Sequence, residues 1–424
     1  MAKINRAFKI RIYPSQEQQE YLNKTLGSCR FIYNQMLAER ISTYNELKDN
    51  KEKLYTHKYK TEKQYKEEFE FLKEVDAKAL QFSNRNLQLA YTNFYKSLKN
   101  VKKGQKVGFP KFKSKKEHYD SFTTCMAIKI DFDSKAIKIP KLSPVKFKHR
   151  KNTKSWYRSA ELKRITISRE PSGKYFASLL FEGEQDFKGE QDITNPKILG
   201  LDMSLQDFYV DSLGNSPDYK RVYRGYQEKL AKAQKQFSRK TSGSKNREKA
   251  RIKVARIHEK IRNKRKDFLE KLSIRLIKEN DVIVVENLSL KGMSQALNLG
   301  KSVMDLGYST FVSKLQYKAL WNDKTVIMAD KWFASSKTCS TCGFVKKDLL
   351  LQERSWECPK CKSTHHRDLN AAVNLQNFGK KYIGLEEPEL TSMEMEALAC
   401  SNTSETAVEE VENLNGDIKK PRGL

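Results

Sequence analysis

The 424-residue chain carries 82 Lys and Arg against 52 Asp and Glu, a formal net charge of +30, and 38% of its residues are hydrophobic. The chain is longer than a typical single domain with one hydrophobic core, so we expect two or three domains. No stretch approaches the roughly 18 apolar residues of a membrane-spanning helix and no secretory leader is visible, which argues against a membrane or secreted protein. The positive charge instead favours a long polyanionic partner, with nucleic acid as the first candidate.

The amino-terminal residues predict a strand followed by a helical region. Residues 4–13 alternate between apolar and polar, Pro14 ends the run, and Ser15 with Gln18 has the pattern of a capping box that opens a helix. Apolar residues then recur at helical spacing to about Leu98. The pattern predicts a helical bundle inserted after the first strand.

The stretch 102–116 combines Gly, Pro, two Phe and seven Lys, and it predicts a loop or an extended arm. Aromatic side chains interleaved with Lys can stack on bases while the ammonium groups meet phosphates. Lys111 and Lys113 are the candidate contacts here. A solvated linker explains the same composition equally well.

Residues 119–190 predict a run of short strands, with a hairpin turn at Pro171-Ser172-Gly173. Together with the amino-terminal strand they predict a small β-barrel.

Strands and helices alternate in the remainder of the chain, which is the pattern of an α/β domain. Three apolar strands are expected within 198–214, 281–290 and 325–330, the first carrying Asp202 and the second ending in Glu286. Helices are expected at 305–320 and 367–378.

A long, highly basic helical hairpin is expected at 218–280, with its loop at Thr241 to Ser244. One interpretation is a solvated helix face. The other is a surface that follows a nucleic-acid duplex by binding phosphates without reading bases. The candidate phosphate-binding residues are Arg251, Lys253, Arg256, Lys260, Arg262, Lys264 and Arg265.

Four cysteines form two C-x2-C pairs, Cys339 with Cys342 and Cys358 with Cys361, separated by 15 residues. Tetrahedral zinc takes four thiolates, and two such turns can present them to one structural Zn²⁺. Redox-active pairs are the weaker alternative, because neither pair opens a helix after a strand. Since four Cys already fill the site, we expect His365 and His366 to contact nucleic acid or solvent.

Two apolar strands carry a carboxylate, Asp202 and Glu286, and a third acid, Asp368, begins a helix. A carboxylate on a buried strand is costly unless it is paired or coordinates a cation. Three convergent carboxylates are the ligands that Mg²⁺ prefers, and two such ions can support phosphodiester hydrolysis. Singly, Asp202 could end a strand, Glu286 could cap a turn and Asp368 could pair with Arg367 or a Lys. Together they favour a metal-dependent nuclease.

The composition reverses near the carboxyl terminus. Residues 382–424 contain ten acidic and three basic residues, a net charge of −7. Such a segment is expected to be disordered and dispensable for folding and activity. Cys29, Cys125 and Cys400 lie apart from one another, which suits a reducing compartment.

Several motifs resemble those of TnpB proteins, the transposon-encoded RNA-guided nucleases of the OrfB family, and of the compact type V CRISPR effectors related to them. They are GLDMS around Asp202, VVENLSLKGM around Glu286, LQYKAL, WFASSKTCSTCG, CPKC and RDLNAAVN, and the opening KIRIYPSQEQQEYLNKTLGSCRFIYNQML resembles that family's as well. The likeness covers most of residues 5–378. Departures are Asp-Met-Ser in place of Asp-Leu-Gly, no Gly after Cys361, and His366 at a position that is often acidic.

The resemblance implies a multidomain α+β protein with a β-barrel wedge domain, an inserted helical recognition domain, a split RNase H-like (RuvC) α/β nuclease domain and a four-cysteine zinc ribbon. Asp202, Glu286 and Asp368 match the family's catalytic, Mg²⁺-binding acids. The expected divisions are 1–14 and 118–190 for the wedge, 15–117 for recognition, 191–333 for RuvC including the hairpin, 334–362 for the zinc ribbon, 363–378 for the final RuvC helix and 379–424 for the tail.

The expected function is cleavage of guide-matched DNA next to a short adjacent motif, with two Mg²⁺ ions and one structural Zn²⁺. The expected partners are a guide RNA and double-stranded target DNA, in a monomeric ribonucleoprotein of the prokaryotic cytoplasm, associated with the nucleoid. The alternatives are an RNA-guided or plain DNA-binding regulator without cleavage, a compact type V CRISPR effector, and a DNA-strand transferase that uses the same acids.

Overall fold

The computed structural model describes residues 2–99, 107–117, 120–148, 156–185, 195–289, 293, 300–350 and 352–385. The acidic tail from residue 386 and the first five residues of the basic stretch 102–116 lie outside this part of the chain. The protein divides into two compact units, Met1–Phe187 with Leu230–Glu259, and Lys188–Lys229 with Lys260–Leu424. In the described ranges, no helix is long and apolar enough to cross a membrane.

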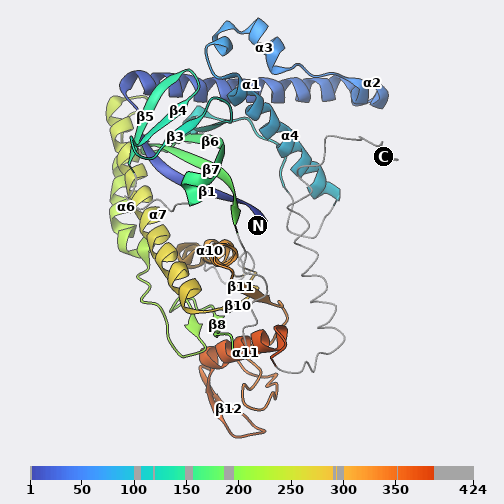
Figure 1. The fold of residues 1–424 in the computed structure, drawn as a ribbon, viewed down its shortest axis with the longest axis vertical. Coiled ribbons are helices and arrows are strands. Elements are labelled where there is room, and N and C mark those ends of the chain that lie inside the picture. Colours follow the sequence, from blue (N-terminus) through green and yellow to red (C-terminus); the bar gives the residue numbers. More distant parts are fainter. Residues whose placement is uncertain are drawn as a thin grey trace. The chain divides into compact units, whose positions relative to one another are not determined.

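The first unit is built on a seven-stranded antiparallel sheet with the amino-terminal strand at its centre (Figure 1). Strand β1 (Ala2–Tyr13) pairs with β7 over most of its length and with β5 near its end. The order β2-β6-β7-β1-β5-β4-β3 leaves the two end strands unjoined within the described ranges, so the predicted barrel is a half-barrel sheet. The other strands are β2 (Asp120–Thr124), β3 (Lys129–Asp131), β4 (Ala136–Ile139), β5 (Leu142–Lys148), β6 (Glu161–Arg169) and β7 (Tyr175–Gln185).

Helices follow β1 in the first unit, as predicted from the helical spacing of the apolar residues after Ser15. Helix α1 (Gln16–Leu47) begins at Ser15, and the predicted capping box is present: the Ser15 hydroxyl accepts from the Gln18 amide and the Gln18 side chain accepts from the Ser15 amide. Buried residues of α1 and α4 share one apolar core with the sheet. The remaining elements are α2 (Lys51–Thr56), α3 (Glu62–Glu68), η1 (Glu70–Lys73), α4 (Ala77–Lys99), η2 (Lys115–Glu117) and α5 (Trp156–Ser159).

The turn at Pro171-Ser172-Gly173 is also confirmed, because it joins β6 to its antiparallel neighbour β7. Gly173 has φ +85°, a conformation that glycine adopts without steric cost. Its amide donates to the Glu170 carbonyl and closes the turn.

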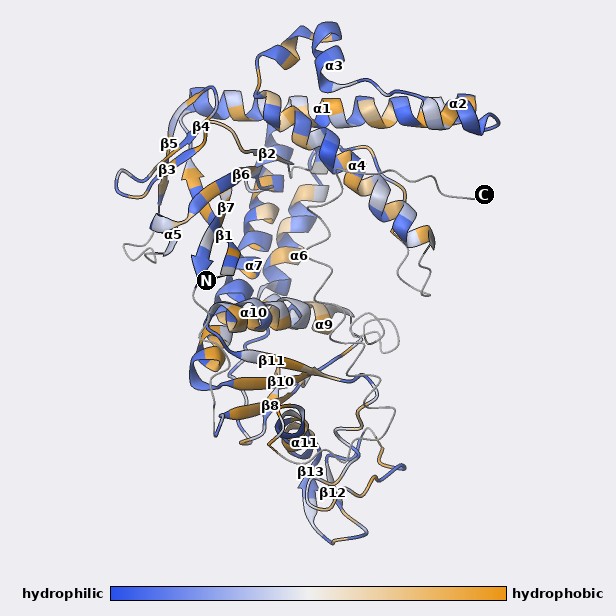
Figure 2. Ribbon diagram, turned by 45° about the vertical axis from the view of Figure 1, so that its right-hand side comes forward, coloured by the Kyte–Doolittle hydropathy of each residue, from blue (hydrophilic) through white to orange (hydrophobic). Residues whose placement is uncertain are grey.

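The second unit contains a four-stranded sheet in the order β11-β10-β8-β9. Strands β8 (Ile198–Asp202), β10 (Val282–Glu286) and β11 (Thr325–Ala329) are parallel, and the short β9 (Val210–Asp211) runs antiparallel to β8. The three parallel strands are side by side and mostly hydrophobic (Figure 2). Parallel strands that are apolar on both faces need a layer of helices on each side.

Helices supply these two layers. Residues 199, 201, 283 and 285 of the sheet pack against α7 (Lys245–Glu279) and α10 (Tyr308–Trp321) on one face. Residues 198, 282 and 284 pack against α11 (Arg367–Tyr382) on the other face. Helix α11 is longer than the predicted 367–378, and Ile383 beyond it also packs on the core. Helix α9 (Gly300–Leu306) precedes α10.

The basic helical hairpin is confirmed as α6 (Val222–Ser238) and α7, joined through 239–244. The stretch Leu230–Glu259, which contains the hairpin's turn, is part of the first unit, and the rest of both helices belongs to the second.

Candidate functional site

The two acids predicted on strands lie at one edge of the parallel sheet. Asp202 is the last residue of β8, and Glu286 is the last residue of β10. The strands are neighbours in register, with Leu201 opposite Val285, so the next residue on each strand is an acid. The two carboxyl groups lie close enough for each to influence the pKa of the other. The carboxyl ends of parallel strands are where α/β folds hold their ligands.

The third acid reaches this edge because α11 lies close against β8. Gly200 makes the approach possible: a Cβ atom there would stand 2.0 Å from the Ala372 carbonyl oxygen and 2.6 Å from the Gln376 nitrogen. The Gln376 side chain also donates to the Ile198 carbonyl at 2.8 Å. Asp368, in the first turn of α11, thereby comes close enough to interact electrostatically with Asp202 and Glu286.

The electrostatics of this cluster disfavour a negative charge on Asp202 and on Glu286. Burial, and then the neighbouring charges of Glu286 and Asp368, raise the pKa of Asp202 well above its usual value. Burial also raises the pKa of Glu286, although the hydrogen bond from Ser335 lowers it. Carboxyl groups arranged in this way become stably ionised when a cation lies among them.

Two further residues contact the acids, and they were not predicted. Arg354 donates to both carboxylate oxygens of Asp368, at 3.1 and 3.2 Å, so the partner of Asp368 is neither Arg367 nor a Lys. The hydroxyl of Ser335, from the WFASSK motif, donates to Glu286. Its place in that motif was the available signal for Ser335, whereas nothing in the sequence pairs Arg354 with an acid 14 residues away.

The donor set fits Mg²⁺, which prefers carboxylate oxygens and usually keeps several water ligands. Asp202 and Glu286 influence each other's pKa, while Asp368 forms an ion pair with Arg354. The three are therefore less tightly gathered than the four cysteine thiols, whose sulfur atoms all lie within 4.8 Å of one another. An incomplete oxygen shell leaves coordination positions for water or a phosphate.

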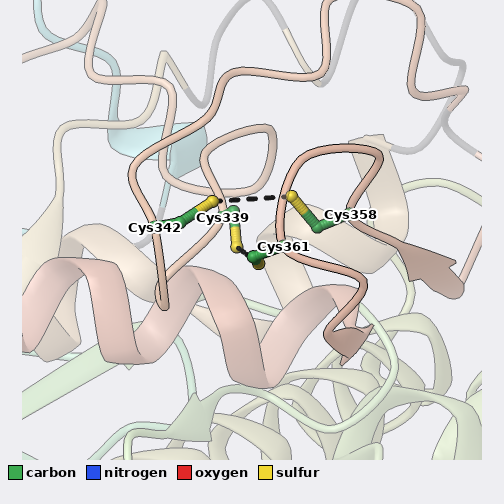
Figure 3. A group of neighbouring side chains, drawn as sticks. All are labelled: Cys339, Cys342, Cys358 and Cys361. Atoms are coloured by element: carbon green, nitrogen blue, oxygen red, sulfur yellow. Dashed lines mark hydrogen bonds between the residues drawn. The ribbon is translucent and has the colours of Figure 1, made fainter.

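The four cysteines form a compact cluster (Figure 3). The Cys339 and Cys361 sulfurs are 3.6 Å apart, as are those of Cys342 and Cys358. A tetrahedron with metal–sulfur distances of about 2.3 Å has sulfur–sulfur edges of about 3.8 Å. The cluster therefore fits a zinc ion, which would hold together the turns around two small pairings, β12 (Ser355–Glu357) with β13 (Thr364–His366), and the bridge between Thr338 and Val345.

The two cysteine turns have the same backbone form although their sequences differ. The Gly343 amide donates to the Cys339 carbonyl, and the Lys362 amide donates to the Cys358 carbonyl, each at 2.9 Å. Gly343 has φ +72° and Lys362 has φ +63°. The missing glycine after Cys361 is thus replaced by a Lys in a left-handed conformation, which costs about 1–2 kcal/mol. The departure from the family pattern leaves the turn geometry unchanged.

The prediction that His365 contacts nucleic acid or solvent was wrong, because this side chain is buried. His366 is exposed to solvent. His365 is buried, its Nε2 lies 3.0 Å from the Cys339 sulfur and 2.8 Å from the Ser363 hydroxyl, and its ring packs on Trp356. The reason is the alternation of β13, which turns successive side chains to opposite faces. Burial opposes ionisation of Cys339, but hydrogen bonds from Ser363, two backbone amides and His365 lower the pKa of its thiol to about 5.

The cysteine cluster is anchored to α11 by two asparagines of the RDLNAAVN motif. The Asn374 side chain donates to the Ser335 and Thr338 carbonyls, each at 2.7 Å. The Asn370 side chain donates to Thr338 and accepts from the Ser340 amide. This segment therefore links the carboxylate cluster to the cysteine cluster.

The zinc assignment makes a testable prediction. Freshly purified protein prepared without chelators is expected to contain about one zinc per chain, and Cys358→Ser is expected to lower that content and loosen residues 334–362. Metal analysis and hydrogen exchange measure the two effects. The matched control is Cys125→Ser, because Cys125 is exposed and lies outside the cluster. Full-length protein without zinc would contradict the assignment.

The predicted phosphate-binding residues fall into two groups. Arg251 forms an ion pair with Glu248 and donates to the Pro171 carbonyl, and Arg265 forms an ion pair with buried Asp305. The side chains of these two residues are engaged in contacts within the protein. The exposed members are Lys111, Lys113, Lys253, Arg256, Lys260, Arg262 and Lys264.

Comparison with known proteins identifies three family models. The model described as "Probable transposase" matches residues 179–297, "Cas12f1-like, TNB domain" matches 308–375, and "Helix-turn-helix domain" matches 1–49. In the structure, residues 1–49 contain β1 and one continuous 32-residue helix, and not the two short helices of a helix-turn-helix. The TNB match covers α10, β11, the cysteine cluster and most of α11.

Curated relatives match along most of the chain. A protein of Streptomyces pristinaespiralis named "Putative RNA-guided DNA endonuclease" is 33% identical over 383 residues, covering 89% of this chain and 90% of the relative. InsQ of Escherichia coli K12, which has the same description, is 27% identical over 398 residues, covering 90% and 94%. The Cas12f1 chain in a complex with sgRNA and target DNA has the same fold, with a TM-score of 0.50 at 15% identity, over 88% of this chain and 99% of that one. The chain belongs to the OrfB family of TnpB-like proteins.

Proposed function

We propose that the protein is an RNA-guided, Mg²⁺-dependent DNA endonuclease. The observation that carries the proposal is the meeting of Asp202, Glu286 and Asp368 at the carboxyl edge of a parallel sheet, in a protein of net charge +30. The names of the relatives from Streptomyces pristinaespiralis and Escherichia coli support the same activity. The sheet order, with one antiparallel strand beside three parallel strands, supports a RuvC domain of RNase H-like fold.

In the proposed mechanism Asp202, Glu286 and Asp368 would hold two Mg²⁺ ions, which would supply charge neutralisation at the scissile phosphate and a more acidic bound water. The residues of the chain create and orient this site. Ser335 fixes the Glu286 carboxylate by a hydrogen bond, and Arg354 neutralises Asp368. Gly200 allows α11 to bring Asp368 into place.

The divisions expected from the family resemblance are proposed as functional regions. The half-barrel sheet, 1–14 with 118–190, would be the wedge, and 15–117 the recognition region that holds guide RNA and reads a motif beside the DNA target. Residues 191–333 with 363–378 would form the nuclease domain, and 334–362 a zinc ribbon that positions the DNA strand. The working particle is proposed to be a monomeric, transposon-associated ribonucleoprotein, whose base pairing supplies sequence specificity.

Sequencing the RNA that copurifies with the protein would identify the guide, and a reprogrammed guide would then test cleavage of matched DNA. Cut products with 5′-phosphate ends and no joined strands are expected. Guide-dependent binding without cutting would instead support the DNA-binding regulator, and joined strands would support the strand transferase. An RNA encoded in a CRISPR array would favour the type V effector.

The hairpin is proposed to bind the phosphates of the guide–target duplex through its exposed residues. Replacing Lys253, Arg256, Lys260, Arg262 and Lys264 with Gln is expected to weaken binding about equally for all guide sequences. The slope of log affinity against log salt should become shallower by up to about 0.9 for each lost phosphate contact. Affinity measurements at several salt concentrations test this.

The matched control replaces Arg251 and Arg265 with Gln. Because both are in ion pairs within the protein, this variant should lose stability while its salt slope stays near that of the wild type. An unchanged slope in the five-residue variant would leave the hairpin as scaffolding.

A further inference from the structure

The segment after β11, which contacts Glu286 through Ser335, presents an aromatic side chain to solvent. Trp332 is 83% exposed, whereas the next residue, Phe333, packs against Phe378 of α11 with ring centroids 5.1 Å apart. An indole ring is large and apolar, so its exposure leaves much apolar area in water. Single exposed apolar residues are common and by themselves indicate little. The surroundings of Trp332 make it informative.

The segment that carries Trp332 is fixed to Glu286 at both ends. At its start, Ala329 lies opposite Glu286 in the parallel pairing of β10 and β11. At its end, the Ser335 hydroxyl donates to the Glu286 carboxylate. Between these points the Asp330 side chain accepts from the Trp332 amide at 2.7 Å. Trp332 therefore lies on a short loop, both ends of which are anchored at Glu286.

The geometry limits how far Trp332 lies from the acids. Neighbouring strands are about 4.8 Å apart, and three residues span at most about 11 Å. The Trp332 backbone is thus within about 16 Å of the Glu286 backbone. At about 3.4 Å for each stacked nucleotide, this distance corresponds to a few nucleotides of one DNA strand.

The chemistry of the loop suits a nucleotide. The Lys331 ammonium lies 5.1 Å from the centroid of the Trp332 ring, so a positive charge and an aromatic face are presented together. Proteins that hold single-stranded nucleic acid combine these two features, because bases of any sequence stack on aromatic rings while cations meet the phosphates.

We propose that Trp332 is a substrate-positioning residue, on which a base of the DNA strand entering the carboxylate site stacks. This inference rests on the proposed function, since it takes the strand to be cut at Asp202, Glu286 and Asp368. The stacked base would hold the scissile phosphate in register with the acids, so the effect on cleavage should exceed the effect on overall DNA binding.

Single-turnover cleavage of guide-matched DNA by the ribonucleoprotein tests the proposal with three substitutions. Trp332→Ala and Trp332→Leu are expected to slow cleavage about tenfold or more, because neither offers an aromatic face. Trp332→Phe should stay within about threefold of wild type. The matched control is Met304→Ala, which removes a 75% exposed apolar side chain from α9 of the same unit and should leave the rate unchanged.

A second measurement does not depend on cutting. In an Asp202→Ala background, Trp fluorescence is compared between the wild-type Trp332 protein and its Trp332→Phe variant as guide RNA and then target DNA are added. The difference isolates Trp332 among the four tryptophans. Quenching of this difference signal on adding matched DNA is expected.

The outcomes separate the two hypotheses. A wild-type protein that never cuts matched DNA would defeat the proposed function, while the fluorescence measurement still tests stacking. If the wild type cuts, a Trp332→Ala or Trp332→Leu variant that cuts as fast as wild type would overturn the stacking role alone. A Trp332→Phe variant as slow as Trp332→Ala would also overturn it. Quenching by guide RNA with no further change on adding DNA would assign the ring to RNA and overturn it too.

Discussion

Replacing Asp202, Glu286 or Asp368 with Ala is expected to reduce cleavage of guide-matched DNA by at least about 100-fold, the scale on which losing one preorganised electrostatic group acts. The reason is that two of these carboxylates do not hold a pair of Mg²⁺ ions as three do. RNA-guided DNA binding should remain nearly intact, because it depends on base pairing and backbone contacts. Cleavage and binding assays on the same ribonucleoprotein measure both effects.

The matched control is Asp267→Asn, which alters an exposed carboxylate of the same unit whose partner is Lys271 on the next turn of α7. This variant should cut at the wild-type rate. A wild-type rate in any one of the three Ala variants would remove that acid from the site.

Gly200→Ala is expected to impair both stability and cleavage, although residue 200 is not one of the three acids. A Cβ atom there would stand 2.0 Å from the Ala372 carbonyl oxygen, so α11 must move away from β8. Overpacking of this kind costs about 1–3 kcal/mol of folding free energy. The same movement displaces Asp368 from Asp202 and Glu286. Thermal unfolding and single-turnover cleavage are expected to show a lower midpoint and a slower rate.

Gly225→Ala is the matched control for this prediction. Gly225 lies in α6, and a Cβ atom there would meet nothing within 4 Å. Ala is the better helix former, so this variant should be as stable as wild type or slightly more stable. If Gly200→Ala were equally harmless, the close packing of α11 on β8 would not be what positions Asp368.

The parts of the site that follow from local patterns could be predicted from the sequence. An apolar run ending in an acid identifies both the strand and its carboxylate, which is why Asp202 and Glu286 could be expected to converge. The spacing of the four cysteines likewise predicts a cluster, since each turn needs only nearby residues.

Other parts depend on contacts between distant segments, and the sequence carried no signal for them. Arg354 meets Asp368 only because β12 and β13 pair and bring residue 354 next to the start of α11. The role of Gly200 depends on a helix that begins far later in the chain. His365 was expected to contact nucleic acid or solvent because four Cys already fill the metal site, and the sequence did not reveal which face of β13 this residue occupies.

The same distinction applies to the fold. The helical hairpin, the capped α1 and the turn between β6 and β7 follow from local periodicity and turn residues, and all were predicted. The expectation of a closed barrel required knowing whether the two end strands pair. In the described ranges they do not, so the sheet is a half-barrel.

Carboxylates at the sheet edge are proposed to hold the cations that make cleavage possible. The most direct test is the rate at which the ribonucleoprotein cuts guide-matched DNA as Mg²⁺ is raised from zero in the presence of chelator. We expect no cutting without Mg²⁺, a rate that rises with Mg²⁺ to a plateau, and no cutting of mismatched DNA at any concentration. Undiminished cutting in excess chelator would contradict this proposal.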